Sequence, residues 1–445
     1  MSDRPPRVAV VGSGPAGFYA AGALLASDEP PVEVDMIERL PTPWGLVRLG
    51  VAPDHPNIKA VSRAFEKIAS QPGFRFFGNV EVGRDVTHEE LAARYDAVLY
   101  AVGAQTDRQL GIPGEDLPGS WPATAFVAWY NGHPDFQHLE FDLSHERAVV
   151  IGNGNVALDV ARMLALTPEE LAPTDTTDEA IEAISGAGVR EILVVGRRGP
   201  VQAAWTPVEV GELGELAGAD ILVDSAQLEL DPASAAELEA APPTVKRNVE
   251  HLREYAQRSP SGKARAIRLR FLASPVAIRG DAKVEGIELV RNELVDGRAV
   301  ATDDTETVPC GIVFRSVGYR GVELPGVPFD EGSGTIPNEG GRVRAGLYVA
   351  GWIKRGPSGV IGTNKKDATE TVGLVLEDVR SGALRAASGE DLEELLSKRG
   401  VDHVMYAGWE AIDAAERAAG EPSGRPRVKL CTWDELLDAS RTAAR

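Results

Sequence analysis

Two glycine-rich motifs, 140 residues apart, are the part of this sequence with the most recognisable chemistry. The motif Gly-Ser-Gly-Pro-Ala-Gly at residues 12–17 follows the apolar run 8–11, and Gly-Asn-Gly-Asn-Val-Ala at residues 152–157 follows the apolar run 148–151. In such motifs the glycines permit a tight turn, a close approach to a pyrophosphate and close strand–helix packing. The helix that begins there points its positive end at the phosphates. One motif is weak evidence, but two predict two bound dinucleotides with electrons passing between them.

The strand expected after the first motif ends in an acid. Residues 32–37 have the composition of a buried strand, and Glu38 follows them. A carboxylate at this place hydrogen-bonds a ribose of the dinucleotide. The alternative is a glycine turn in an unrelated α/β domain, but the acid and the strand context favour a nucleotide site. From the motif we expect contacts from Gly12, Gly14, Gly17 and Glu38.

The strand expected after the second motif, residues 191–196, ends in Arg197 and Arg198 and not in an acid. Two guanidiniums suit a 2′-phosphate, whereas a carboxylate would repel it, so the second nucleotide is predicted to be NADPH and not NADH. The alternative is a pair of ordinary solvated charges. The third glycine is replaced by Ala157, which widens the helix–strand packing slightly. An acidic, Pro/Thr-rich insertion at residues 167–188 lengthens the spacing to the arginines.

Composition sets further bounds. A chain of 445 residues is too long for one core and fits two or three domains. It has only two cysteines, Cys310 and Cys431, which excludes a disulfide framework, an iron–sulfur cluster held within this chain and a Cys-x-x-Cys redox pair. A polar N-terminus that leads straight into a strand argues against a signal peptide, and no apolar stretch is long enough to span a bilayer. We therefore expect a cytoplasmic protein.

The net charge of −21 argues against nucleic acid as a partner. One segment, residues 246–270, is nevertheless basic, with eight lysines and arginines against two glutamates. It is either a solvated helix and hairpin face or a docking surface for an acidic protein, where charge steering speeds the encounter. The docking residues proposed from this segment are Arg247, Arg253, Arg265 and Arg268.

The order of the elements predicts an insertion. Strand–helix alternation runs from residue 7 to about 105, a second nucleotide-binding fold starts near residue 148, and the buried strand 347–352 returns to the first site. The predicted fold class is α/β, with two Rossmann-like dinucleotide-binding domains built on parallel sheets, one inserted into the other. The expected domains are residues 1–105 and 321–445 for the first and 106–320 for the inserted one.

Longer motifs carry a resemblance to a known family. They lie at residues 41–48 (Pro-Thr-Pro-Trp-Gly-Leu-Val-Arg), 50–56, 151–159, 195–200, 351–357 and 359–366. On these motifs, and nearly end to end from residue 8 to about 430, the chain resembles the adrenodoxin-reductase-type ferredoxin–NADP⁺ reductases, including their bacterial homologues. Such runs are far more specific than the bare glycine motifs.

The resemblance implies FAD in the first domain and NADPH in the inserted one. It implies hydride transfer from NADPH to FAD, which then passes single electrons to a ferredoxin-type iron–sulfur protein. A flavin can accept a hydride and can also release its electrons one at a time. Implied FAD contacts are Ala16, Glu38, Leu46, Val82, Trp352, Gly359, Val360 and Ile361. Implied NADPH contacts are Asn153, Gly154, Asn155, Val156, Arg197, Arg198, Glu209 and Gly359. The expected enzyme needs neither a metal nor a covalent nucleophile, and nothing demands more than a monomer.

Two residues are candidates for shaping the reaction site. In the family a histidine and a glutamate at the places of His55 and Glu212 lie near the flavin and the nicotinamide, where they tune charge or relay the N5 proton. The alternative for His55 is a residue at the start of a helix that hydrogen-bonds the backbone, and the alternative for Glu212 is a structural role.

Two other functions of the protein stay open. One is a flavoenzyme subunit like the small chain of glutamate synthase, which would need more cysteines. The other is a non-enzymatic flavin-bearing scaffold, against which the two intact motifs argue.

Overall fold

The computed structural model describes residues 4–359 and 361–444, and the chain divides into two compact units. The first unit spans residues 1–106 and 318–445, and the second is the continuous segment 107–317. The expected boundaries, after residues 105 and 320, differ from the observed ones by one and three residues. Which coenzyme each unit binds is argued from the sites below.

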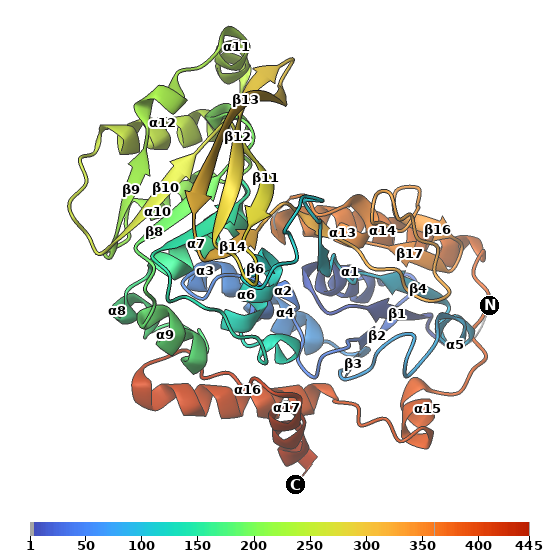
Figure 1. The fold of residues 1–445 in the computed structure, drawn as a ribbon. Helices are drawn as coiled ribbons and strands as arrows, with labels where there is room; N and C mark the ends of the chain where they lie inside the picture. The colour runs from blue at the N-terminus through green and yellow to red at the C-terminus, as the bar shows by residue number, and fades with distance from the viewer. Residues whose placement is uncertain (1–3, 360, 445) are drawn as a thin grey trace. The chain divides into compact units, whose positions relative to one another are not determined.

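A six-stranded sheet forms the centre of the first unit, in the order β16-β17-β4-β1-β2-β3 (Figure 1). Every neighbouring pair is parallel except β16 with β17. The strands are β1 (Arg7–Val11), β2 (Glu33–Ile37), β3 (Phe74–Phe77), β4 (Ala97–Tyr100), β16 (Arg342–Arg344) and β17 (Leu347–Val349). β17 follows the inserted unit in sequence and pairs with β4, which precedes it, so the sheet is completed only after the insertion. This confirms the predicted insertion and fold class.

Helices cover both faces of this sheet, which explains why its central strands β1 and β4 are almost uniformly apolar. Val8 and Val10 of β1 face a core built with α1, α4, α14, α16 and α17, whereas Ala9 and Val11 face a core built with α5 and α15. The helices are α1 (Pro15–Leu25), α2 (Leu46–Leu49), α3 (Pro56–Lys59), α4 (Ser62–Ala69), α5 (His88–Arg94), α13 (Trp352–Arg355), α14 (Ile361–Ser381), α15 (Leu392–Lys398), α16 (Tyr406–Gly420) and α17 (Trp433–Ser440).

The second unit is also built on a six-stranded sheet, which is parallel throughout and has the order β6-β14-β7-β8-β10-β9. Its strands are β6 (Ser120–Pro122), β7 (Arg147–Ile151), β8 (Glu191–Val195), β9 (Ala219–Val223), β10 (Arg265–Arg270) and β14 (Ile312–Arg315). Its helices are α6 (Ala123–Tyr130), α7 (Asn155–Ala165), α8 (Pro168–Leu171), α9 (Asp178–Ser185), α10 (Pro207–Leu213), α11 (Pro232–Ala240) and α12 (Pro243–Gln257). Ala148 and Val150 of β7 face α6, α7, α9, α10 and α12.

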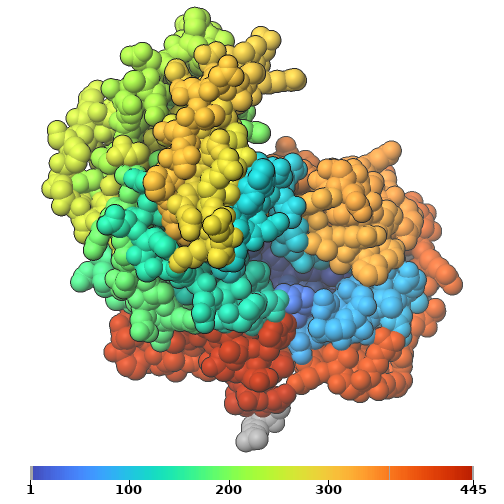
Figure 2. Space-filling model, viewed as in Figure 1, coloured from blue at the N-terminus to red at the C-terminus, as the bar shows by residue number. Residues whose placement is uncertain are grey.

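The other face of the second sheet is covered by a three-stranded antiparallel sheet, β11 (Ala273–Arg279), β12 (Gly286–Val295) and β13 (Arg298–Pro309). Most side chains of β13 are exposed, and Figure 2 shows this strand in yellow and orange on the surface. β10 ends at Arg270, and Leu272, with a positive φ of 53°, lies where the chain passes into β11 of this second sheet.

Helices α3 and α4 follow each other closely, with only Ala60 and Val61 between them. These two residues keep helical dihedral angles, and i→i+3 hydrogen bonds join them to the start of α4. Among the described residues no helix is both long and apolar enough to cross a membrane.

Candidate nucleotide-binding sites

The first glycine loop has the geometry of a pyrophosphate cradle. Gly12 has φ +102°, and a Cβ there would lie 2.6 Å from the carbonyl oxygen of Ala101. A Cβ on Gly17 would lie 1.9 Å from the carbonyl oxygen of Gly12, so both positions require glycine. A Cβ on Gly14 would meet no atom within 4 Å, so open space lies beside the residue that caps the 11-residue helix α1. An anionic group fits this space at the positive end of the helix.

A second loop, residues 41–49, lies directly against this cradle. The N–H of Trp44 donates a 3.0 Å hydrogen bond to the carbonyl of Ser13. Gly45, at φ +48°, approaches so closely that a Cβ there would lie 3.0 Å from the Cα of Gly14. Leu46, an expected FAD contact, begins α2 and is 43% exposed, which leaves its side chain free to cover a ligand.

Glu38 stands at the end of β2 beside the same glycine loop. One carboxylate oxygen accepts hydrogen bonds from the N–H and the hydroxyl of Ser13, at 2.9 and 2.7 Å, and the other accepts one from the N–H of Leu40 at 3.1 Å. These bonds fix the carboxylate at the strand end. Because a carboxylate has about four lone-pair sites, it can still accept a ribose hydroxyl.

The segment after β17 returns to the start of α1. Gly351, at φ +78°, lies so close to Ala16 that an added Cβ would be 2.7 Å from the Cβ of that alanine. Trp352 follows; its indole N–H donates to the carbonyl of Ser358 at 3.2 Å, and its ring lies 5.3 Å from that of Tyr319. Of the remaining expected FAD contacts, Gly359 has φ +82°, Ile361 begins α14, Val82 is buried in the core beneath β1, and Val360 lies outside the described residues.

The second glycine loop has the same construction. Gly152 has φ +142°, and a Cβ there would lie 2.1 Å from the carbonyl oxygen of Ser316, while a Cβ on Gly154, the cap of the 11-residue helix α7, would meet nothing within 4 Å. The third position, Ala157, is fully buried, so the packing of α7 on β7 accommodates a methyl group.

The expected NADPH contacts that follow Gly152 are held by the segment before α10. The Asn153 carbonyl accepts a 2.8 Å hydrogen bond from the N–H of Ala204, and the Asn155 side-chain oxygen accepts one of 2.8 Å from the N–H of Thr206. Val156 packs partly buried against the main core of the second unit. The second loop is therefore anchored on both sides of its open space.

Arg197 and Arg198 follow β8 and are exposed. Within residues 4–359 and 361–444 neither guanidinium has a hydrogen-bond or ion-pair partner. Their main chain, by contrast, is fixed: Asn292 donates from its side chain to the carbonyl of Arg197 at 2.8 Å, and the N–H of Leu272 donates to the carbonyl of Arg198 at 3.2 Å. Two unpaired cations on a fixed backbone suit a dianionic phosphate.

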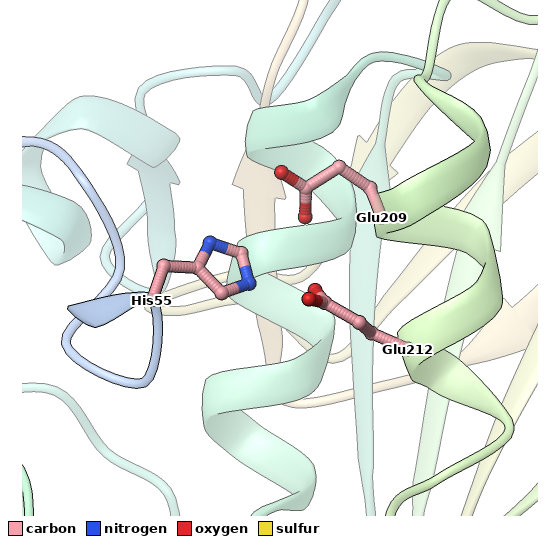
Figure 3. Close-up of side chains that lie close together, drawn as sticks. All are labelled: His55, Glu209 and Glu212. Atoms are coloured by element: carbon pink, nitrogen blue, oxygen red, sulfur yellow. The ribbon is translucent and has the colours of Figure 1, made fainter. Parts of the chain in front are cut away.

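Glu209 and Glu212 lie one turn apart on α10, and Figure 3 shows both carboxylates on the same side of that helix. The buried guanidinium of Arg162, from α7, lies 3.3 Å from the Glu209 carboxylate and 2.8 Å from that of Glu212. His55, also labelled in Figure 3, is buried at the N-cap of α3, and its side chain makes no capping hydrogen bond there. His55 belongs to the first unit and Glu212 to the second, and their joint action at one site stays a prediction.

The basic segment needs one correction. Arg265 is only 9% exposed, because the alternation of β10 turns it toward the core, where it donates to the carbonyls of Ile184 and Leu166 at 2.8 and 3.3 Å. Its assignment as a docking residue is wrong. Arg247 and Arg253 on α12 and Arg268 on β10 are exposed. Arg247 pairs with Glu250 and Arg268 with Glu191, so the surface is less positive than its sequence suggests.

Sequence reasoning missed several residues that hold these sites. Arg162 and Asp159 both interrupt the apolar residues of α7, and a charged residue in such a helix was a usable signal of a buried charge partner. Asn292 was missed because it lies 95 residues from Arg197 along the chain. Ser13 was missed because a serine between glycines is ordinary.

Comparisons with known proteins agree with this geometry. Residues 6–185 match the family model described as pyridine nucleotide-disulphide oxidoreductase. The chain is 55% identical to NADPH-ferredoxin reductase FprA of Mycobacterium leprae. The alignment has 446 residues and covers 97% of each chain. It is 43% identical to the mitochondrial NADPH:adrenodoxin oxidoreductase of Salvelinus fontinalis, over 98% of this chain and 91% of that one.

A solved structure extends the likeness to three dimensions. Mycobacterium tuberculosis FprA in complex with NADPH superposes with a TM-score of 0.93 at 52% identity, covering 98% of this chain and all of the other. Identity at this level over the full length exceeds what a shared fold alone produces. The chain belongs to the family of NADPH-ferredoxin reductases that includes FprA and the adrenodoxin reductases.

Proposed function

We propose that this protein is a flavoprotein oxidoreductase that takes a hydride from NADPH onto FAD and passes single electrons to a ferredoxin-type iron–sulfur protein. The observation that carries the proposal is the contrast between the two glycine loops. One is followed by Glu38, which suits a ribose. The other is followed by Arg197 and Arg198, whose guanidiniums have no partner in the described part of the chain and suit a 2′-phosphate. The named functions of the relatives agree with this contrast.

The first unit holds FAD. Gly12, Gly14 and Gly17 shape the space for its pyrophosphate, Glu38 accepts from its ribose, and the segment around Trp352 lies beside the start of α1 to pack against its ring system. Ala16, Leu46, Val82, Gly359, Val360 and Ile361 complete the proposed contacts. Bound FAD supplies the conversion between a two-electron donor and a one-electron acceptor.

The second unit holds NADPH. Asn153, Gly154, Asn155 and Val156 surround its pyrophosphate at the positive end of α7. Arg197 and Arg198 bind the 2′-phosphate, and Glu209, fixed by Arg162, orients the nicotinamide side of the molecule.

His55 and Glu212 act on protons and charge at the reacting end of the site. Hydride transfer needs no general base, so these two groups adjust its rate and do not enable it. Glu212 is already oriented by the 2.8 Å contact with Arg162.

The partner is a ferredoxin-type iron–sulfur protein, which docks on the exposed arginines Arg247, Arg253 and Arg268. If attraction of opposite charges drives docking, KM for ferredoxin rises with ionic strength, and Arg253→Glu raises it about tenfold at low salt. Reduction of ferricyanide, which needs no docking, stays at the parent rate. An unchanged KM for ferredoxin in Arg253→Glu would mean that ferredoxin docks on another surface.

We also propose that the protein is a monomer, which light scattering tests. We propose a cytoplasmic location, which cell fractionation tests.

The main experiment is stopped-flow spectroscopy on the purified protein without oxygen. One FAD per chain is expected, with rapid bleaching of its visible absorbance by NADPH, slower bleaching by NADH, and recovery when oxidised ferredoxin is mixed in. A colourless protein that cannot be loaded with FAD contradicts the proposal, as does a flavin that NADPH leaves oxidised.

A further inference from the structure

A buried carboxylate in the C-terminal segment holds the loop that covers the first glycine cradle. Glu416 of α16 is fully buried, and its carboxylate accepts two hydrogen bonds from the guanidinium of Arg48, at 2.8 and 2.5 Å. It also accepts one from Arg427 at 3.0 Å and one from the N–H of Leu430 at 3.0 Å. Arg48 is the last but one residue of loop 41–49, so a bidentate pair joins this loop to a helix 368 residues further along the chain.

The charge on Glu416 is retained despite complete burial. Burial by itself raises the pKa of this carboxyl, but Arg48 and then Arg427 outweigh it and hold the pKa below its usual range. Such a pair contributes little net stability compared with apolar packing, whereas loss of one partner leaves an uncompensated buried charge. A group of this kind is suited to fixing a geometry.

Aromatic contacts hold the same loop to the same helix. The rings of Trp44 and Trp409 meet edge to face with centroids 4.8 Å apart, and the Arg48 guanidinium lies 5.3 Å from the centre of the Trp409 ring. Lys429 donates to the carbonyl of Arg48 at 3.3 Å. Helix α16 in turn packs against the central sheet through Tyr406, whose ring lies 6.3 Å from Phe74 and 6.4 Å from Phe76.

The other side of loop 41–49 faces the glycine cradle, through the bond from Trp44 to Ser13 and the close approach of Gly45 to Gly14. We propose that Glu416 is a positioning residue for FAD, which acts through Arg48 to keep loop 41–49 closed over the cradle. The C-terminal segment is then part of the flavin site although its own residues need not touch the flavin. This inference rests on the proposed FAD site and adds the element that controls its closure.

The test compares two buried carboxylates of the first unit. Glu416→Gln removes the charge that holds loop 41–49. Asp378→Asn removes a matched one: Asp378 of α14 is 8% exposed and accepts two 2.9 Å hydrogen bonds from Arg342 and one from Tyr348, neither of which belongs to the loop. Both changes are expected to lower the urea midpoint of the FAD-free protein. Only Glu416→Gln is expected to raise the dissociation constant for FAD, by about tenfold or more, since a misplaced loop loses its aligned contacts.

Two further readouts separate positioning from general destabilisation. The visible circular dichroism and the fluorescence of the bound flavin report the surroundings of its ring, and both are expected to change in Glu416→Gln and to stay at parent values in Asp378→Asn. Arg48→Lys keeps the cation but not the two-pronged contact, so it is expected to fold and to weaken FAD binding less than Glu416→Gln does. If Glu416→Gln does not fold, Arg48→Lys alone carries the comparison with Asp378→Asn.

Equal FAD affinity in Glu416→Gln, Arg48→Lys and the parent would overturn the inference. It would also be overturned if Asp378→Asn, at the same loss of stability, raised the dissociation constant for FAD as much as Glu416→Gln and Arg48→Lys do. Both results leave the proposed function intact, because in each the parent protein still binds FAD. A parent that binds no FAD would instead contradict the proposed function itself.

Discussion

The side-chain amide of Asn292 donates a 2.8 Å hydrogen bond to the main-chain carbonyl of Arg197 and a second one, also 2.8 Å, to the hydroxyl of Ser274. Asn292 is 2% exposed and lies where the register of β12 with β13 shifts. The antiparallel sheet thereby fixes the backbone at Arg197, and the side chains of Arg197 and Arg198 remain unpaired among the described residues. A residue outside both glycine loops thus orients the proposed 2′-phosphate site.

Replacement of Asn292 by alanine is expected to lower the preference for NADPH. KM for NADPH should rise about tenfold, or ~1.4 kcal/mol, while KM for NADH stays near the parent value, because NADH has no 2′-phosphate to misplace. Steady-state kinetics with both nucleotides measure this. Asn131→Ala is the matched control, since Asn131 is also buried but bonds the carbonyl of Val127 in α6, the helix that it caps. Parallel changes in both KM values would show that Asn292 has only a structural role.

Replacement of His55 by glutamine is expected to slow flavin reduction without abolishing it. The single-turnover rate of flavin reduction is expected to fall about tenfold, as for loss of a modest proton-transfer or charge effect. The His55 imidazole adjusts charge and proton transfer, whereas the hydride moves without a base. FAD content should not change. His403→Gln serves as the control, since it removes another imidazole from the first unit. If the variant reduces its flavin at the parent's stopped-flow rate, His55 has only a structural role at the start of α3.

Acid is expected to weaken the ion pairs that hold the start of α15 to the rest of the first unit. Burial by itself raises the pKa of Asp391, but hydrogen bonds from Arg75 and Arg7 lower it to about 2, from the ordinary 3.8. Because the folded pKa is the lower one, this contribution is complete above pH of about 4 and is lost as the pH falls toward about 2. Asp391 is partly exposed, so the contribution is ~1 kcal/mol.

Asp391→Asn measures this contribution directly. At neutral pH the variant should unfold at a lower urea concentration than the parent, and the difference should shrink as the pH falls from about 4 to about 2. A difference that stays constant across that range would mean that the stabilising effect of Asp391 does not depend on its charge.

The sequence predicted the parts of the sites that depend on local order. Gly12, Gly17 and Gly152 are required where strand meets helix, and their spacing alone reports this. The position of Arg197 and Arg198 follows in the same way from the end of β8. The insertion was predictable too, since a lone buried strand near the C-terminal end needs a sheet to join.

What the sequence could not supply are contacts between distant segments. Nothing near Arg48 indicates Glu416, because the pair forms only when α16 packs across the sheet. Counting charges placed Arg265 on the surface for a related reason. The carbonyls that accept its hydrogen bonds belong to Ile184 and Leu166, which are far away in sequence. Composition shows how many charges a segment has, whereas tertiary packing decides which of them reach the surface.

The most direct test of the account is the rate of cytochrome c reduction with NADPH or NADH, with and without added ferredoxin, for the parent and for Arg197→Ala. The account predicts ferredoxin-dependent reduction by the parent with a strong preference for NADPH, which falls roughly tenfold to a hundredfold in the variant as a charge-assisted phosphate contact is lost. Equal use of both nucleotides by the parent, or a rate that ferredoxin does not raise, would contradict it.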